Sequence, residues 1–386
     1  MKQISAIVMA LVLFVVTPLS VQAHSVSEDA ALAGHHLATV IELIVTRYVG
    51  DEVSVDELLE AALRGMTDIL DQYSAYLSAA ELAEFTNNLS GRLVGIGVSM
   101  QILEDGNIVV SRVLPDSPAL EVGILPGDIL LTVEGQDIQG KPLEFVSNII
   151  TNPDYENVTI TVYRDGVVLR FDIQKAEIRS PTVLIDRFDS VAEADGLGGM
   201  HNYRYVQIST IGTATAHDVR TAVQQMQAEG VNGIIIDLRG NTGGYLDVTM
   251  DIANQFVPQG IVLQTQSQSG RVRTYSSMLT QQPFENIVVL VNRFTASAAE
   301  VIASSLQDSG AAIVIGEPTF GKGLVQTVYA LPTGGALKLT TEEFFRRNGG
   351  PINHIGVIPC IEVERRTCQT EPDHALRRGL EVLAGL

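Results

Sequence analysis

The chain has 386 residues, of which 46% are apolar and only 18% are charged, which is enough apolar material for two or three domains with their own cores. This composition excludes an intrinsically disordered chain. The formal net charge of −20, with no block of Lys or Arg to offset it, excludes nucleic acid and anionic membrane surfaces as partners.

Residues 1–23, "MKQISAIVMALVLFVVTPLSVQA", have the pattern of a secretory signal peptide. Lys2 precedes an apolar stretch, and the small-residue pattern Val21-Gln22-Ala23 stands before His24. The alternative is an uncleaved anchor, but the apolar stretch is shorter than the ~20 residues that a membrane span needs. We therefore expect an exported protein, periplasmic or in the cell envelope if bacterial, with no stable membrane span after signal removal.

Residues 24–87 are predicted to form an N-terminal helical region. The segments "ALAGHHLATVIELIVTRYV" and "SVDELLEAALRGMTDIL" carry apolar residues at spacings of three and four. The second segment opens at Ser54 with Glu57 three residues later, which is the spacing of a capping box. His35 and His36 lie on the first helix without a further ligand at helical spacing, so we interpret them as a surface feature and expect no metal site.

Residues 88–178 change to short β-type runs separated by Gly, Asp-Gly and Pro. Within them, "SPALEVGILPGDILLTVEGQDIQG" resembles part of a PDZ domain, a module in which an extended peptide joins a sheet edge and a loop of backbone N–H groups holds its terminal carboxylate. The alternative is that the glycines of this loop only allow a β-bulge. The matching loop consists of Val94, Gly95, Ile96, Gly97 and Val98.

Residues 179–386, with a core at about 200–365, alternate between strand and helix patterns. Buried strands are indicated by the apolar runs "RYVQIST", "VNGIIIDL", "NIVVLVN" and "AAIVIGE". Between them, "TAHDVRTAVQQMQAEG", "LDVTMDIANQFV" and "SAAEVIASSLQDSG" have helical spacing. The pattern predicts βαβ units and a largely parallel sheet covered by helices.

In such a sheet, binding and catalytic residues usually lie where strands end and helices begin. One such turn is Gly240-Asn241-Thr242-Gly243-Gly244, where a Gly-Gly pair can leave N–H groups directed at an anion or a developing oxyanion. Any tight turn can also use Gly-Gly, so the signal is weak alone.

A second turn places Ser297 between a strand and the helix that follows it. Ser297 as a simple helix N-cap is the alternative to a nucleophile. The position of Lys322 favours the interpretation of Ser297 as a nucleophile. A lysine between Gly321 and Gly323, in a loop folded over the strand ends, would be buried. Burial favours the neutral amine, which is a competent general base. Gln326 could hold this amine in place without adding charge.

A histidine base fits the sequence less well than Lys322. Of the seven histidines, only His201 and His354 could reach the sheet ends, and neither sits in a turn built to present it. The two cysteines, Cys360 and Cys368, could form a disulfide in an oxidising compartment or remain as two thiols.

The segment "RFTASAAEVIASSLQDSGAAIVIGEPTFGKGLVQT" resembles the catalytic segment of the C-terminal processing peptidases, also called tail-specific proteases, which carry a PDZ domain and a Ser-Lys catalytic pair. "DLRGNTGG", "GMTDILDQYSAYLS" and "GPINHIGVIP" resemble further motifs of that family. The departures are Gln72 in place of a proline, Ala299 in place of a serine, Cys360 in place of an aspartate, and a segment "TNPDYENVTITV" without the usual glycines.

The resemblance implies a multidomain α/β and β fold: an N-terminal helical segment, a PDZ-like β module and a βαβ-rich peptidase core of the ClpP/crotonase-like type. It also implies roles for individual residues. Ser297 would be the nucleophile, Lys322 the general base and Gln326 the orienting residue, with oxyanion-hole donors at Ala298 and at Gly243 or Gly244. No metal and no organic cofactor is implied.

The resulting hypothesis is an exported serine endopeptidase that recognises the apolar C-termini of protein or peptide substrates through its PDZ domain. An adaptor protein and a homo-oligomer remain open. One alternative is a non-catalytic PDZ peptide-binding or scaffold protein on the same fold, although Ser297, Lys322 and Gln326 are all present. The other alternative is a Ser-Lys esterase or amidase that acts on small molecules. The PDZ-like module argues against it, because a small substrate needs no tail-binding domain.

Overall fold

A computed structural model describes residues 28–90, 92–103, 106–114, 117–152, 154–179, 181–187, 202–332, 334–363 and 373–385. The chain divides into two compact units. The small unit is Ser90–Pro181, and the large unit contains the residues before and after it. In these ranges no helix combines the length and the apolar character needed to cross a membrane.

The large unit begins with helices α1 (Glu28–Arg47), α2 (Val55–Asp68) and α3 (Ala79–Ser90). The predicted capping box at the start of α2 is confirmed: the N–H of Glu57 donates to Ser54 Oγ, and the N–H of Ser54 donates to Glu57 Oε2. The expectation of helix throughout this region is wrong at one point, because strand β1 (Ala75–Leu77) lies between α2 and α3. A three-residue strand has no periodicity of its own, and β1 forms only by pairing with a distant strand.

The small unit is a β module with two short helices. Its main sheet has the order β3-β4-β5-β7-β8, with β6 beside β5, and a separate pair joins β2 to β9. An apolar core that includes Ile96, Val146 and Ile173 fills its interior. The elements are β2 (Arg92–Gly95), β3 (Val98–Ile102), β4 (Ile108–Val113), α4 (Pro118–Glu121), β5 (Ile129–Val133), β6 (Gln136–Asp137), α5 (Leu143–Thr151), β7 (Asn157–Arg164), β8 (Val167–Gln174) and β9 (Ala176–Arg179).

The centre of the large unit is a six-stranded sheet with the order β10-β11-β12-β15-β16-β19. The four strands β11, β12, β15 and β16 run parallel, as the apolar runs predict. Pairing of Ile234 with Ile287 and of Val289 with Val314 fixes their register. The strands are β10 (Val183–Arg187), β11 (Tyr203–Ile208), β12 (Gly233–Asp237), β15 (Asn286–Val291), β16 (Ile313–Gly316) and β19 (Ile361–Glu362).

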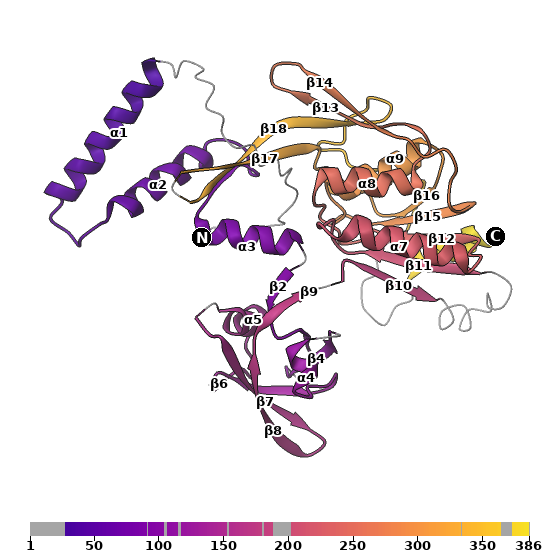
Figure 1. The fold of residues 1–386 in the computed structure, drawn as a ribbon, viewed down its shortest axis with the longest axis horizontal. Coiled ribbons are helices and arrows are strands. Elements are labelled where there is room, and N and C mark those ends of the chain that lie inside the picture. Colours follow the sequence, from indigo (N-terminus) through magenta and orange to yellow (C-terminus); the bar gives the residue numbers. More distant parts are fainter. Residues whose placement is uncertain are drawn as a thin grey trace. The chain divides into compact units, whose positions relative to one another are not determined.

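Helices cover both faces of this central sheet (Figure 1). On one face, α7 (Thr215–Ala228), α8 (Leu246–Phe256) and α9 (Ala298–Asp308) bury apolar residues against side chains such as Ile236 and Val289. On the other face, α10 (His374–Leu383) packs Leu380 and Leu383 against Ile235 and Leu290. Alternate residues of a strand therefore enter different cores, which explains why the central strands β12 and β15 are mostly apolar.

A second sheet completes the large unit, with the order β1-β18-β13-β14 and with β17 also paired to β18. Its long strand β18 lies between β1, from the N-terminal region, and β17, which follows the Lys322 loop. The strands are β13 (Gly260–Ser267), β14 (Val272–Ser277), β17 (Leu324–Ala330) and β18 (Ala336–Arg346).

Candidate active site

Ser297 lies at the turn between β15 and α9, in a backbone conformation that few non-glycine residues adopt. Its φ is 60° and its ψ is −117°. The side chain is fully buried, and its Oγ has no hydrogen-bond partner within the described residues. Such strain persists only where the surroundings enforce it, and it is common at catalytic turns. Ser297 is also the N-cap residue of α9, and its N–H donates to Glu300 Oε2 in a capping-box arrangement, so a capping position and an unpartnered hydroxyl coexist at this turn.

Glu300 is the residue that enforces this turn. Its fully buried carboxylate accepts hydrogen bonds from the backbone N–H groups of Ser297, Gly321 and Lys322 and from the hydroxyl of Thr319. The nitrogen of Ser297 lies 2.7 Å and that of Lys322 2.9 Å from the same oxygen, Oε2. Burial raises the pKa of Glu300, while the four hydrogen bonds counteract this increase. One carboxylate thus joins the serine turn to the lysine loop.

The glycines that flank Lys322 are required by close backbone contacts. A Cβ on Gly323 would lie 2.5 Å from the nitrogen of Asn353, and a Cβ on Gly321 would lie 3.0 Å from the nitrogen of Ile355. The N–H of His354 also donates to the carbonyl of Gly321. The loop is therefore pressed against residues 353–356, where only glycine fits on either side of the lysine.

The side chain of Lys322 is completely buried, as its predicted role requires. Burial and the nearby charge of Lys338 lower the pKa of Lys322 to about 7, although Asp71 and Glu300 act in the opposite direction. A substantial fraction of the amine is therefore neutral near neutral pH. The ring of Tyr73 lies over this amine, with Nζ 4.3 Å from the ring centroid.

Gln326 is also fully buried, on β17 four residues after Lys322. Its Nε2 donates to Thr340 Oγ1 at 3.1 Å, whereas its Oε1 has no partner within the described part of the chain. The amide thus retains one unused acceptor in a buried position, which is a costly arrangement unless another group uses it.

The Gly-Gly turn packs directly against Ser297. A Cβ on Gly243 would lie 3.1 Å from Ser297 Cβ and 3.1 Å from the nitrogen of Ala298. The N–H of Gly243 donates to Asn241 Oδ1, and the carbonyl of Asn241 accepts from the N–H of Ala296. The two turns that the sequence selected are therefore neighbours, and the N–H of Gly243 is already occupied.

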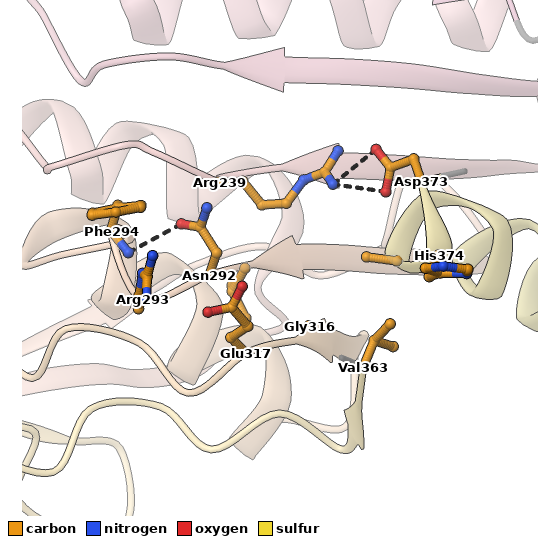
Figure 2. Close-up of a pocket in the computed structure, with 11 residues that line it drawn as sticks. Arg239, Asn292, Arg293, Phe294, Gly316, Glu317, Val363, Asp373 and His374 are labelled. Carbon is orange, nitrogen blue, oxygen red and sulfur yellow. Dashed lines mark hydrogen bonds and ion pairs between the residues drawn. The ribbon is translucent and has the colours of Figure 1, made fainter. Parts of the chain in front are cut away.

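A small polar pocket of about 200 Å³ lies at the carboxyl ends of β12, β15 and β16, and neither Ser297 nor Lys322 lines it. Figure 2 shows the side chains of this pocket, with Arg239 beside Asp373 and Asn292 beside Phe294. Arg239, two residues after β12, donates to Asp373 at the start of α10. Asn292 Oδ1 accepts from the N–H groups of Gly240 and Phe294. The C-terminal helix and Asn292 thus fix the segment that carries the Gly-Gly turn.

The predicted peptide loop lies in the small unit, where it connects β2 to β3. Ile96 is buried in the core of this unit, whereas Val94 is exposed. Gly97 has a φ of +83°, and a Cβ there would lie 2.2 Å from Ser117 Cβ, so only glycine fits. Strand β3 is at the edge of its sheet and contacts α5. An extended peptide would find an unpaired strand edge here.

Three predictions fall partly or wholly outside the described residues: the signal segment 1–23, the histidine His201 and the cysteine Cys368. Cys360 is exposed, and its pairing with Cys368 stays a prediction. His354 is exposed on the loop that contacts Gly321.

Sequence reasoning missed Glu300, Asp71 and Tyr73 as parts of this site. For Glu300 a signal was available, because Ser297 and Glu300 have the spacing of a capping box. Asp71 and Tyr73 lie within the motif "GMTDILDQYSAYLS", but the sequence does not reveal their place in the site, since their contacts are formed with segments more than 200 residues away.

Comparison with known proteins agrees with this organisation. The profile of Peptidase family S41 matches residues 202–363, and that of the PDZ domain matches residues 94–174. The chain is 32% identical to carboxy-terminal processing protease CtpB of Bacillus subtilis (strain 168) over 84% of its own length, and it spans 66% of that protein. It is 30% identical to the carboxy-terminal-processing protease of Bartonella bacilliformis, over 84% of this chain and 74% of that one.

Among solved structures, the photosystem II D1 C-terminal processing protease is similar with a TM-score of 0.51 and 25% identity, over 90% of this chain and 92% of the other. Common descent accounts for the presence of an S41 core and a PDZ module in one chain, and for the motif residues that lie around one buried serine. The chain belongs to the carboxy-terminal processing proteases of peptidase family S41.

Proposed function

We propose that this protein is an exported serine endopeptidase that binds the apolar C-termini of protein substrates and cleaves the chain with Ser297 and Lys322. The observation that carries the proposal is the buried carboxylate of Glu300, which holds the backbone of both residues on a single oxygen atom. A buried serine hydroxyl without a partner among the described residues, on a turn that Glu300 joins to the loop of a lysine whose pKa is lowered to about 7, supports the role of an activated nucleophile.

In the proposed mechanism the neutral amine of Lys322 takes the proton of Ser297 Oγ as the oxygen attacks the scissile carbonyl carbon. The resulting ammonium returns this proton to the leaving amine, and an ester between Ser297 and the substrate remains. Water then attacks the ester while the neutral amine takes its proton; the bond between the carbonyl carbon and Ser297 Oγ breaks, the ammonium returns the proton to Oγ, and the acid product leaves. Every proton passes through Lys322, so no metal or cofactor enters the reaction.

The oxyanion of the tetrahedral intermediate would be stabilised by backbone N–H groups. Ala298 begins α9 and supplies one donor at the positive end of the helix. The second donor comes from the Gly243-Gly244 turn. Because the N–H of Gly243 donates to Asn241, Gly244 is the better candidate.

Gln326 is proposed as the orienting residue. Its Nε2 is occupied by Thr340, which leaves the carbonyl oxygen Oε1 as the group that would accept a hydrogen bond from the Lys322 amine. An amide oxygen can position an amine without stabilising the ammonium as strongly as a carboxylate would.

Substrate recognition is assigned to the small unit. The loop of residues 94–98 would hold a terminal carboxylate, and the edge of β3 would pair with the last residues of the substrate. Export is proposed from the signal pattern of residues 1–23.

The proposal is tested with purified protein and an unfolded protein substrate that ends in an apolar residue, with the products identified by mass spectrometry. We expect cleavage to be lost in Ser297→Ala and in Lys322→Ala. The exposed residues Ser276 and Lys141 provide matched controls, and their alanine variants should cleave normally. Undiminished cleavage in Ser297→Ala or in Lys322→Ala would refute the proposed roles and favour a binding or scaffold protein.

A further inference from the structure

The turn of residues 71–74, which precedes β1, lies beside the Lys322 site although it is distant in sequence. Strand β1 pairs with β18, with Ala75 opposite Lys338. The hydroxyl of Ser74 accepts a hydrogen bond from the N–H of Thr340, and the hydroxyl of Thr340 lies 3.1 Å from Asp71 Oδ1. The turn is therefore attached to the strand that neighbours Gln326.

Tyr73 occupies the space over the amine of Lys322. Its ring centroid is 4.3 Å from Nζ, while the Tyr73 side chain is itself half-buried. One side of the ring thus faces the amine and the residue still reaches solvent. A ring in this position excludes water from the amine, and exclusion of water is the main cause of the lowered pKa of Lys322.

Asp71 controls the orientation of Gln326 through Thr340. An ionised carboxylate can only accept hydrogen bonds, so the hydroxyl of Thr340 must donate to Asp71. The oxygen of Thr340 is then left to accept, and it receives Nε2 of Gln326 at 3.1 Å. This order places the amide oxygen of Gln326 on the opposite side, where it has no other partner within the described residues.

Asp71 is ionised in this arrangement. Burial would raise its pKa, but hydrogen bonds from Tyr73, Ser74 and Thr340 outweigh burial and lower the pKa. The charged groups that face Lys322 are Lys338 on β18, Asp71 on the turn and Glu300 on α9. Asp71 and Glu300 favour the ammonium, whereas burial and, to a smaller extent, the charge of Lys338 favour the neutral amine.

We propose that Asp71 and Tyr73 are positioning residues of the catalytic site: Tyr73 shields the base Lys322 from water, and Asp71, through Thr340, makes Gln326 present its carbonyl oxygen. This inference rests on the proposed Ser-Lys mechanism. It assigns a catalytic contribution to the N-terminal helical region, which lies outside the matched peptidase segment 202–363.

The roles proposed for Tyr73 and Asp71 predict different changes in the pH profile of kcat/KM. In Tyr73→Leu, water reaches the amine, so the midpoint of the acidic limb should move up by about one pH unit while the alkaline plateau is kept. In Asp71→Asn the plateau should fall by about 10-fold because Thr340 no longer has a fixed direction, and the midpoint should not rise because a negative charge has been removed.

Three further variants separate positioning from a general loss of structure. Thr340→Val, which removes the hydroxyl, should lower the plateau as Asp71→Asn does. Thr340→Ser, which keeps the hydroxyl, should retain the wild-type plateau. Tyr73→Phe should retain the wild-type midpoint because it keeps the ring. Asp68, an exposed carboxylate on α2, provides the matched control, and Asp68→Asn should leave the profile unchanged.

The experiment is run on the full chain, with melting temperatures recorded for each variant, and it begins with Ser297→Ala. If that variant cleaves as well as wild type, the proposed function itself has failed. If cleavage requires Ser297 but Tyr73→Leu and Asp71→Asn keep both the wild-type midpoint and the wild-type plateau, the positioning roles are wrong while the Ser-Lys mechanism stands.

Discussion

The backbone N–H groups of Ser297 and Lys322 donate to the same atom, Oε2 of Glu300, over 2.7 and 2.9 Å. Ser297 and Lys322 come from different turns of the central sheet, so their relative position is not fixed by local structure. A single buried acceptor fixes it, because each N–H would be left unsatisfied if the two turns moved apart.

Replacement of Glu300 should therefore disrupt catalysis as well as stability. In Glu300→Gln the amide nitrogen cannot accept, so one side of the group loses its bonds to backbone donors. We expect kcat to fall by about 100-fold, since small displacements of reacting groups have effects of this size, and the free energy of unfolding to fall by roughly 2 kcal/mol.

Steady-state kinetics and thermal unfolding measure these two effects. The matched control is Glu285→Gln, which changes an exposed carboxylate in the segment before β15. A Glu300→Gln enzyme with wild-type kcat would show that Ser297 and Lys322 are held in place by other contacts.

Substitution of Lys322 by methionine should stabilise the protein at neutral pH. The unfolded chain takes up a proton on Lys322 below the ordinary pKa of 10.5, whereas the folded protein does so only below about 7. The contribution of Lys322 to stability is therefore most favourable above pH 10.5, decreases as the pH falls toward 7, and is constant below that. The penalty removed in Lys322→Met is about 4 kcal/mol at pH 7 and about 1 kcal/mol at pH 10.

Calorimetric melting of wild type and Lys322→Met across this pH range tests the sign. The gain in melting temperature should be larger at pH 7 than at pH 10, and the exposed Lys141→Met should show no such trend. A constant difference at all pH values would mean that folding does not lower the pKa of Lys322.

Gly323→Ala should impair activity by displacing the lysine loop. The added Cβ would lie 2.5 Å from the nitrogen of Asn353, so the loop must shift. We expect kcat/KM to fall by about 100-fold. The control is Gly65→Ala on α2, where nothing lies within 4 Å of the new Cβ and helix propensity improves. Equal activity of the two variants would contradict the close packing of the loop.

The small unit should bind peptides through a free terminal carboxylate. In full-length Ser297→Ala, which cannot consume the ligand, a fluorescent peptide with an apolar C-terminal residue should bind, and its C-terminally amidated form should bind at least about 10-fold more weakly. Gly97→Ala should weaken binding of the acid form, because the new Cβ would meet Ser117. Equal affinity for acid and amide would exclude the loop of residues 94–98 as a carboxylate site.

The parallel strands and the site residues that follow them could be predicted from sequence, because β12, β15 and β16 are mostly apolar and are followed by the turns that carry Gly243, Ser297 and Lys322. Strand β1 could not, since three residues have no detectable period and their pairing partner lies more than 250 residues away. The same applies to Asp71, which is separated from Thr340 by 269 residues. Local patterns predict where chemistry can occur, and long-range contacts decide which side chains tune it.

The pH dependence of kcat/KM tests the central claim most directly, because the claim requires Lys322 to act as a neutral base. Between pH 5 and 9, with an unfolded substrate, activity should rise with a midpoint near 7, the value to which burial lowers the pKa of Lys322, and should fall about 10-fold per unit below it. A profile that rises only near pH 10, or one that is flat down to pH 5, would contradict the account.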